Sequence, residues 1–455
     1  MFTRAIRNKK VLIFLLILFI LLIPVFRALR APVVRVNKLK GKIINGESVY
    51  RGNYERTGFI NLNPILSEPK LSWSFKLSHF LSENALIPSY SHIAYKNYVF
   101  LIDPRGILHA LNADSGEEIW KIERKDYFTV GKPWVIADDV LFYTTGKEKI
   151  VGVDIRTGRE VFRCNLPDDE VFDKSGFIIR DGRLYFAVMK RRRNSLVGFY
   201  PYCIPEERVY AIDLNTNKIR WRTKIKCDVK KVDPHSSVFA FSWYSGHTLF
   251  YYNRKSKTLI SISPDTGKIK RRIWINLTDA VPIVDGKLFL KGSIYDVETG
   301  EAIWRMNLNY KYFTTPAIKG NTVYFAASSD KEGNVFAFDI DTHKEKWETK
   351  IGKIIRPEFF FIAKSVIYLY EYDKHKGVQL VCLDSNSGKI LWKYDPLKAI
   401  PDFNKIPTLL PEPTKSIYPY WIQSFTSPIP EFDKTPSIGN GAIYISGING
   451  LYKLH

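Results

Sequence analysis

Short apolar runs alternate with turn residues along most of this chain, and the runs have the length of β-strands. In one stretch, residues 315–318 and 323–325 flank a Lys-Gly-Asn-Thr turn, and a third run follows at 334–339. A turn that contains Gly or Asn between two such runs is typical of a β-hairpin. The pattern therefore predicts antiparallel strands rather than helices.

One phrase closes each group of strands and recurs along the chain. In each copy a strand ends at Asp, Asn or Ser, a short turn follows, and Gly, Asn or His takes the left-handed conformation before the next strand. The copies lie roughly 33 to 59 residues apart, which is the length of a propeller blade or a solenoid repeat. We expect each repeat to be a blade of four antiparallel strands. The copies occupy residues 110–120, 152–162, 211–221, 261–267, 296–304, 337–347 and 382–392.

Most copies end in a large aromatic residue on the strand that would be outermost in its blade. A ring in that position can pack between neighbouring blades. We predict a structural docking role, and not a catalytic one, for these residues: Trp73, Trp120, Trp221, Trp304, Trp347 and Trp392.

The last repeat is split between the two ends of the chain. Residues 435–454 copy the first three strands of the 315 repeat and then the chain stops, while residues 71–77 supply a matching outer strand that carries Trp73. Joining the ends in one blade leaves only short, protected sheet edges. The sequence therefore predicts an all-β fold, an eight-bladed β-propeller of four-stranded antiparallel blades closed by the N- and C-terminal strands over residues 50–455.

The phrase Ala-x-Asp-x-x-Thr-Gly-x-x-x-Trp resembles the tryptophan-docking motif of the pyrroloquinoline-quinone (PQQ)-type β-propellers. Residues 50–58, Tyr-Arg-Gly-Asn-Tyr-Glu-Arg-Thr-Gly, are similar to the segment that often opens such chains. The family includes quinoprotein dehydrogenases and non-catalytic scaffolds, so the resemblance leaves function open. In plan the chain is similar to the propeller lipoproteins of the outer-membrane β-barrel assembly machinery. It departs from them by having no lipobox cysteine and by a net charge of +22.

By the same resemblance, a quinoprotein dehydrogenase would offer a catalytic Asp, a calcium shell of Glu, Asn and Asp, and often a vicinal disulfide. The four cysteines include no adjacent pair, and the histidines show no ligand spacing. The repeated turns account for aspartates such as Asp154 and Asp213. We expect no catalytic residue, no metal ligand and no cofactor, with PQQ and calcium as the alternative. The blade assignment places Cys203 and Cys227 near each other, and a disulfide between them is one alternative.

An apolar run at residues 11–26 follows a basic tail. Its length lies between a signal-peptide core and a comfortable membrane span. We expect a basic tail at 1–10, an uncleaved transmembrane signal anchor at 11–29 and a linker at 30–49; cleavage is the alternative. More basic residues follow the run than precede it, which by a strict count would place the propeller inside. A basic tail ahead of an apolar core is how export signals are built, and we expect an extracytoplasmic propeller, periplasmic or at the cell surface.

Basic residues gather in and after an insertion at about residues 190–207. The structural alternative is a solvated charge run without a partner, and the functional one is a face for anionic lipid, polysaccharide or an acidic protein. We expect no nucleic acid partner. The candidate face consists of Lys190, Arg191, Arg192, Arg193, Lys230, Lys231, Arg271 and Arg272.

A second insertion, at residues 396–433, is rich in Pro and aromatic residues and is long for a passive connection. A cap over the central channel and a partner-binding strap are equally consistent with it. Taken together, the sequence predicts a membrane-anchored, non-catalytic scaffold of the cell envelope that binds a protein or a polymer. The alternative is a PQQ- and calcium-dependent dehydrogenase.

Overall fold

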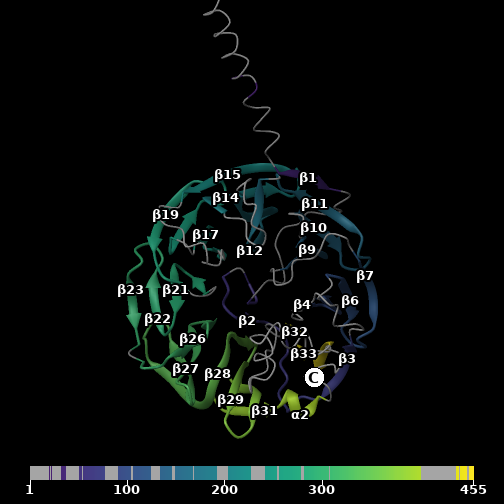
Figure 1. The fold of residues 1–455 in the computed structure, drawn as a ribbon. Helices are drawn as coiled ribbons and strands as arrows, with labels where there is room; N and C mark the ends of the chain where they lie inside the picture. Colours follow the sequence, from purple (N-terminus) through teal and green to yellow (C-terminus); the bar gives the residue numbers. More distant parts are fainter. Residues whose placement is uncertain are drawn as a thin grey trace, which may run out of the picture.

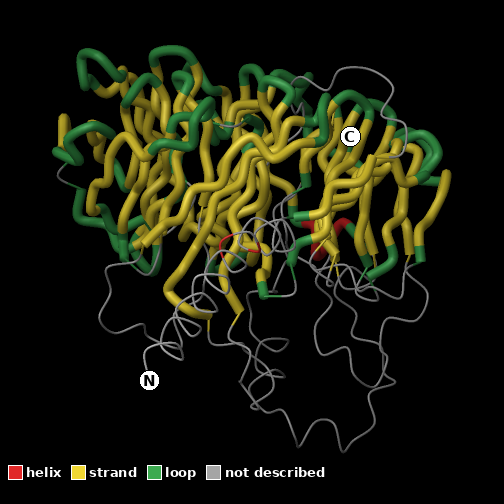
Figure 2. The backbone as a smooth tube through the Cα atoms, turned by 90° about the horizontal axis from the view of Figure 1, so that it is seen from above, coloured by secondary structure: helices red, strands yellow, loops and turns green. Residues whose placement is uncertain are grey.

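The computed structural model describes residues 20, 22, 32–36, 51–53, 55–76, 91–103, 106–123, 134–145, 149–167, 169–191, 203–226, 241–253, 256–277, 281–306, 308–400, 437–439, 441–447 and 450–455. The strands of these residues form antiparallel sheets arranged as a ring (Figure 1). Figure 2, turned by 90°, shows the strands running between two faces of the ring. The fold is an all-β propeller.

Each blade runs from an inner strand to an outer strand in chain order. Blade 1 contains β4 (Ser91–Tyr95), β5 (Tyr98–Ile102), β6 (Leu108–Asn112) and β7 (Glu118–Ile122). Blade 2 contains β8 (Val135–Ala137), β9 (Val140–Thr145), β10 (Lys149–Asp154) and β11 (Glu160–Asn165). Blade 3 contains β12 (Glu170–Arg180), β13 (Arg183–Arg191), β14 (Cys203–Asp213) and β15 (Lys218–Lys226). Blade 4 contains β16 (Phe241–Ser245), β17 (Thr248–Asn253), β18 (Thr258–Ile262) and β19 (Ile269–Trp274).

The remaining blades follow the same plan. Blade 5 contains β20 (Ile283–Val284), β21 (Lys287–Leu290), β22 (Ser293–Asp296) and β23 (Ala302–Arg305). Blade 6 contains β25 (Ala317–Lys319), β26 (Thr322–Ser328) and β27 (Glu332–Asp339), and β24 (Tyr312–Phe313) also pairs with β26. The long strand β28 (Glu345–Ala363) is the outer strand of blade 6 and then the inner strand of blade 7, which continues with β29 (Val366–Asp373), β30 (Gly377–Asp384) and β31 (Ile390–Tyr394). A short helix, α2 (Pro396–Ala399), follows.

Blade 8 joins the two ends of the chain. It contains β32 (Ser437–Gly439), β33 (Ala442–Gly447), β34 (Gly450–Leu454) and, as its outer strand, β3 (Leu71–Lys76). Trp73 lies opposite Lys453 in this pairing. Just beyond it, the backbone amides of Lys70 and His455 donate to each other's carbonyls at 2.9 and 3.0 Å. Counted in this way, the described residues form eight blades.

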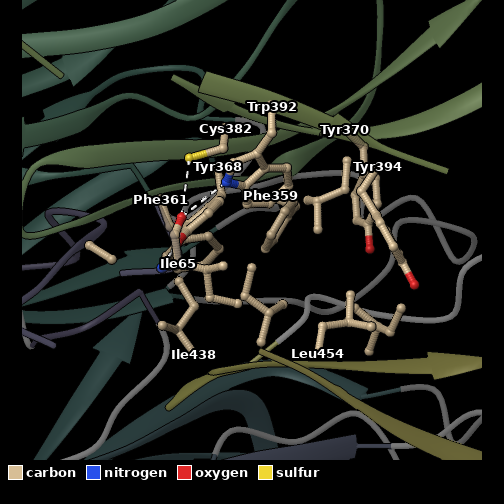
Figure 3. Packing of buried hydrophobic residues seen from close by; sticks show 14 of the residues in the cluster. Ile65, Phe359, Phe361, Tyr368, Tyr370, Cys382, Trp392, Tyr394, Ile438 and Leu454 are labelled. Carbon is tan, nitrogen blue, oxygen red and sulfur yellow. Dashed lines mark hydrogen bonds between the residues drawn. The ribbon is translucent and has the colours of Figure 1, made fainter. Parts of the chain in front are cut away.

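The hydrophobic core is divided among the interfaces between blades. Eight clusters of buried side chains lie within the described residues, and each joins two neighbouring blades around the ring. Figure 3 shows the cluster between blades 7 and 8, where Tyr368 and Trp392 face Ile438 and Leu454. Closure of the ring therefore lets every blade bury apolar side chains against both of its neighbours.

Two segments outside the blades extend the sheets. Strand β1 (Val33–Val36), which lies in the expected linker, pairs antiparallel with β11 and makes blade 2 five-stranded. Strand β2 (Phe59–Ile60) pairs in parallel with the end of β28.

The structure shortens the first predicted insertion, because β13 extends to Arg191 and β14 begins at Cys203. Most of the second predicted insertion, residues 401–433 of 396–433, lies outside the described residues. In the part of the chain that is described, no helix is long and apolar enough to cross a membrane. The predicted anchor at 11–29 falls almost wholly outside that part, which includes only Ile20 and Leu22 of it.

Candidate functional site: the central channel and the basic rim

A segment from the N-terminal side of the ring lies across the inner strands of the blades. We call residues 51–65 the channel strap; β2, its strand, lies inside the ring in Figure 1. Backbone carbonyls of the strap accept hydrogen bonds from successive inner strands or the turns after them. The donors and acceptors are Ile283 to Glu55 at 3.0 Å, Ile318 to Thr57 at 2.7 Å, Ile362 to Gly58 at 2.8 Å, Lys364 to Ile60 at 3.1 Å and Gly441 to Asn63 at 2.8 Å.

The side chain of Glu55 extends this contact to blade 4. The hydroxyl of Ser245 donates to Oε1 of Glu55 at 3.1 Å. Burial raises the pKa of Glu55, and the hydrogen bond from Ser245 opposes that rise. The strap therefore contacts blades 4 to 8 in succession.

Arg51 fixes the start of the strap. Its side chain is 1% exposed. Nη2 donates to the carbonyls of Thr315, at 3.3 Å, and Pro316, and the guanidinium lies 5.4 Å from the centre of the Phe361 ring. Gly58 adopts φ +69°, and a Cβ there would lie 2.7 Å from Nη2 of Arg51.

The motif at residues 51–58 therefore has a structural role: it anchors the start of the channel strap to the ring. Asn53 and Thr57 complete the motif, since Nδ2 of Asn53 donates to Oγ1 of Thr57 at 2.9 Å and the Thr57 amide donates back to Oδ1 at 3.0 Å. The sequence identifies these residues by resemblance, but their role in the channel becomes visible only in the structure.

Metal-binding side chains were sought among the described residues. No group of three or more His, Cys, Asp or Glu side chains that could hold a metal ion occurs among them. Calcium takes Asn and backbone carbonyl oxygens as well as carboxylates, and both a cofactor-free chain and one that binds a quinone with calcium are consistent with these residues.

The predicted docking tryptophans lie between blades. Most indole Nε1 groups donate to a backbone carbonyl at the repeated turn of the next blade. These bonds join Trp73 to Ala113 (3.1 Å), Trp120 to Ile155 (2.9 Å), Trp221 to Pro264 (2.8 Å) and Trp347 to Ser385 (3.1 Å). Trp392 donates instead to Ile65 of the strap, at 3.0 Å. The strap thus takes the place of the turn that the split blade 8 lacks.

Glycine in the repeated turn makes room for these rings. A Cβ at Gly267 would lie 2.6 Å from the Trp221 ring, and one at Gly388 would lie 2.5 Å from the Trp347 ring. Where the turn carries His343, its imidazole stacks on Trp304 with ring centres 5.1 Å apart. The glycine therefore serves both the left-handed backbone and the contact between blades.

Exposed cations line the outer strands of blades 3 and 4. On β15, Trp221 and Thr223 point towards blade 4, and the residues that alternate with them are exposed. On β19, Ile269 and Ile273 are half-buried, and Lys270, Arg271, Arg272 and Trp274 are exposed. We define the basic rim as Lys218, Arg220, Arg222, Lys224, Lys268, Lys270 and Arg272.

Acidic partners occupy part of this surface. Arg220 pairs with Asp213 at 2.7 Å. Arg271 lies on the other side of β19 and pairs with Glu298 of blade 5 at 3.4 Å. Trp274, at the end of β19, is 71% exposed.

The structure places only some of the predicted basic face. Arg271 and Arg272 lie on β19. Lys190 and Arg191 lie at the end of β13, where the structure describes their backbone but not their side chains. Arg192, Arg193, Lys230 and Lys231 lie outside the described residues, and the joint face stays a prediction. Sequence reasoning missed Lys218, Arg220 and Arg222 on β15, which the alternation of residues 218–224 could have revealed.

Several described polar side chains are buried within the blades, and two groups of them show what they do. In blade 3, the Tyr210 hydroxyl donates to both carboxylate oxygens of Glu170 at 3.0 Å, and Arg208 pairs with the same carboxylate. Burial raises the pKa of Glu170 and, with the nearby carboxylate, raises that of Tyr210 to about 12. In blade 1, Nδ1 of His109 lies 2.6 Å from Glu118, and the ring is 3% exposed. Such burial suits a structural role better than contact with a substrate.

The described cysteines are also structural. Cys164 and Cys382 are free and buried. Burial raises the pKa of the Cys164 thiol to about 12, which keeps it protonated and unreactive. The pairing of Cys203 with Cys227 lies outside the described side chains.

Comparison with protein families identifies the repeat. The family described as "Outer membrane protein assembly factor BamB" matches residues 104–199 and 205–352, more than half of the chain. The chain belongs to this family of PQQ-type propellers.

Individual relatives are more distant. A stretch of 88 residues is 33% identical to methanol dehydrogenase [cytochrome c] subunit 1 of Methylorubrum extorquens, covering 17% of this chain and 14% of that protein. The chain thus spans a small part of that enzyme.

Among solved structures, the quinohemoprotein alcohol dehydrogenase of Comamonas testosteroni has a TM-score of 0.53 at 11% identity, covering 90% of this chain and 80% of that one. The quinohemoprotein alcohol dehydrogenase ADHIIG of Pseudomonas putida HK5 has a TM-score of 0.51 at 11% identity, covering 77% and 72%. At this identity the likeness shows the fold alone.

Proposed function

We propose that this member of the BamB family is a non-catalytic scaffold of the cell envelope, tethered to a membrane by residues 11–29, whose propeller lies outside the cytoplasm and binds a protein partner. The family assignment supports a protein partner, since its description names an assembly factor. The anchor and the placement rest on the apolar run and the basic tail before it.

The position of the channel strap is the observation that best supports a non-catalytic role. A dehydrogenase of this fold class would need its quinone and calcium in the channel, where this chain places residues 55–63 against the inner strands of five blades. Arg51 and Gly58 hold the strap through buried contacts, so clearing it would expose a buried guanidinium and several backbone carbonyls.

The alternative, a PQQ- and calcium-dependent dehydrogenase, has the short methanol dehydrogenase match in its favour. Incubating the purified full chain with PQQ and calcium separates the two. If the chain is a scaffold, we expect neither stoichiometric quinone binding nor dye-linked alcohol oxidation. Tight quinone binding with turnover would refute the scaffold proposal.

The partner is sought by crosslinking the full chain in intact envelope membranes, followed by affinity purification and mass spectrometry. A single protein recovered at near-stoichiometric yield is the expected result. A uniform background, equal to that of an unrelated tethered protein, argues against a protein-binding scaffold. For placement, protease added to spheroplasts should digest the propeller, and protection would contradict an extracytoplasmic position.

A further inference from the structure

We propose that the ring stands on the membrane with the rim of blades 2 to 4, and that the basic rim together with Trp274 contacts anionic phospholipid headgroups. The inference rests on the tether of the proposed function and adds to it the orientation of the ring. Neither of its two faces would then be turned to the bilayer.

Strand β1 fixes where the tether meets the ring. Val33 pairs with Asn165, the last residue of β11, so the chain leaves the outer edge of blade 2 at this point. Only six residues separate Val33 from the apolar run that ends at Phe26. Fully extended, these span at most about 25 Å, which holds the edge of blade 2 close to the bilayer surface.

Topology places the exposed tryptophan at the same end of the ring. Each outer strand runs from the repeated turn towards the opposite face, and Asn165 and Trp274 are the last residues of β11 and β19. The side chain of Trp274 is 71% exposed at that end. An exposed tryptophan beside cations is typical of a membrane–water interface, where the ring lies at headgroup level.

Charge is concentrated on the outer strands beside the tether. Blades 3 and 4 follow blade 2 around the ring, and Figure 1 shows β1, β15 and β19 along one arc of the perimeter. Their outer strands carry the seven cations of the basic rim; Arg220 also pairs with Asp213. Each Lys or Arg near an anionic leaflet strengthens its attraction by about fivefold.

Protection of exposed sheet edges is the competing explanation, because Lys on an edge strand discourages edge-to-edge pairing. That need would apply to every blade. Yet β3 exposes Ser72 and Ser74 with one cation, Lys76, and β7 exposes Glu118 beside Lys121. The cations gather where the tether is, which favours a membrane surface.

Fluorescence quenching in reconstituted vesicles tests the contact. The full chain is placed in vesicles of phosphatidylcholine alone or with about 30% phosphatidylglycerol, both containing brominated phosphatidylcholine. The difference in quenching between wild type and Trp274→Phe isolates Trp274. We expect this difference to be at least about twofold larger in anionic vesicles and to fall at 1 M salt, where the Debye length is about 3 Å.

Charge reversal supplies the matched control. Lys270→Glu with Arg272→Glu should abolish the anionic enhancement, whereas Lys374→Glu with Lys376→Glu, two exposed lysines of blade 7, should leave it unchanged. Equal Trp274 quenching in both vesicle types, or quenching seen only after an envelope protein is added, overturns the lipid contact. A chain that does not float with vesicles overturns the tether and the contact together; one that floats without Trp274 quenching overturns the contact alone.

Discussion

Replacing Gly267 by Ala tests how the blades dock, because the perturbation adds one methyl group at a position where the structure has no room. Gly267 adopts φ +72°, and the new Cβ would lie 2.6 Å from the Trp221 ring and 2.6 Å from Oγ1 of Thr223. Both are packed between blades 3 and 4. The ring must move, and its 2.8 Å hydrogen bond to Pro264 is strained or lost.

The magnitude follows from two separable costs. Alanine in the left-handed region costs about 1–2 kcal/mol. Overpacking costs about 1–3 kcal/mol more, so we expect the free energy of unfolding to fall by about 2–5 kcal/mol. Gly320→Ala isolates the first cost, since Gly320 has φ +55° and no atom within 4 Å of the added Cβ. Gly300→Ala should cost about as much as Gly320→Ala, because its Cβ would meet Ile273 at 3.5 Å, an ordinary van der Waals distance.

Urea unfolding followed by tryptophan emission and by far-ultraviolet circular dichroism measures the difference. The comparison is valid where the two signals give coincident, reversible transitions. If Gly267→Ala and Gly320→Ala lose the same stability, the tight contact between turn and indole does not hold the blades together, and the docking argument fails.

Three further predictions follow from other contacts. Trp73→Ala removes the half-buried ring whose Nε1 donates to the carbonyl of Ala113, and should lower the free energy of unfolding by about 2–4 kcal/mol in the same urea assay. The exposed Trp274 is the control, and Trp274→Ala should change the free energy of unfolding by less than about 0.5 kcal/mol. Equal effects of the two substitutions would argue against closure through Trp73. Arg51→Met leaves the buried carbonyls of Thr315 and Pro316 without a donor, so limited proteolysis should cut the channel strap earlier than in wild type. An unchanged cleavage pattern would refute the role of Arg51 in holding the strap. Burial raises the pKa of Glu170 above its ordinary 4.5, so the folded state binds more protons than the unfolded state. The free energy of unfolding should therefore fall as pH rises from that value to the folded-state pKa. Glu170→Gln should remove this pH dependence from unfolding curves measured between about pH 4 and 7, and an identical pH dependence in the variant would show that another group causes it.

Local pattern was sufficient to predict the blades. Strand alternation, turn residues and the repeated tryptophans are short-range signals, and the partial copy at residues 435–445 led directly to the pairing of β3 with β34. The left-handed turn was also predicted at Asn217 and His343, which have φ of 58° and 59°. What pattern did not reveal was the second role of the turn, because clearance for an indole depends on the neighbouring blade.

Long-range placement was not predictable in the same way. The channel strap pairs with the ring through only two residues of strand, Phe59–Ile60, too few to give a periodic signal. Strand β1 has only four residues, and its Val-Val-Arg-Val sequence suits a linker as well as an edge strand. Their partners lie about 100 to 300 residues away along the chain, so only the assembled ring defines their positions.

The first 76 residues contribute more to closure than the pairing of β3 alone suggests. Within them, β1 covers the outer edge of blade 2, the strap crosses blades 4 to 8, and β3 completes blade 8. Trp73 of β3 also reaches Ala113 of blade 1. A ring closed by one strand pair can open by losing that pair, because the other blade interfaces remain intact. Here the strap also bonds to Trp392 of blade 7 through Ile65 and to Gly441 of blade 8 through Asn63, so separating these two blades must break at least one of these bonds as well as the packing between them.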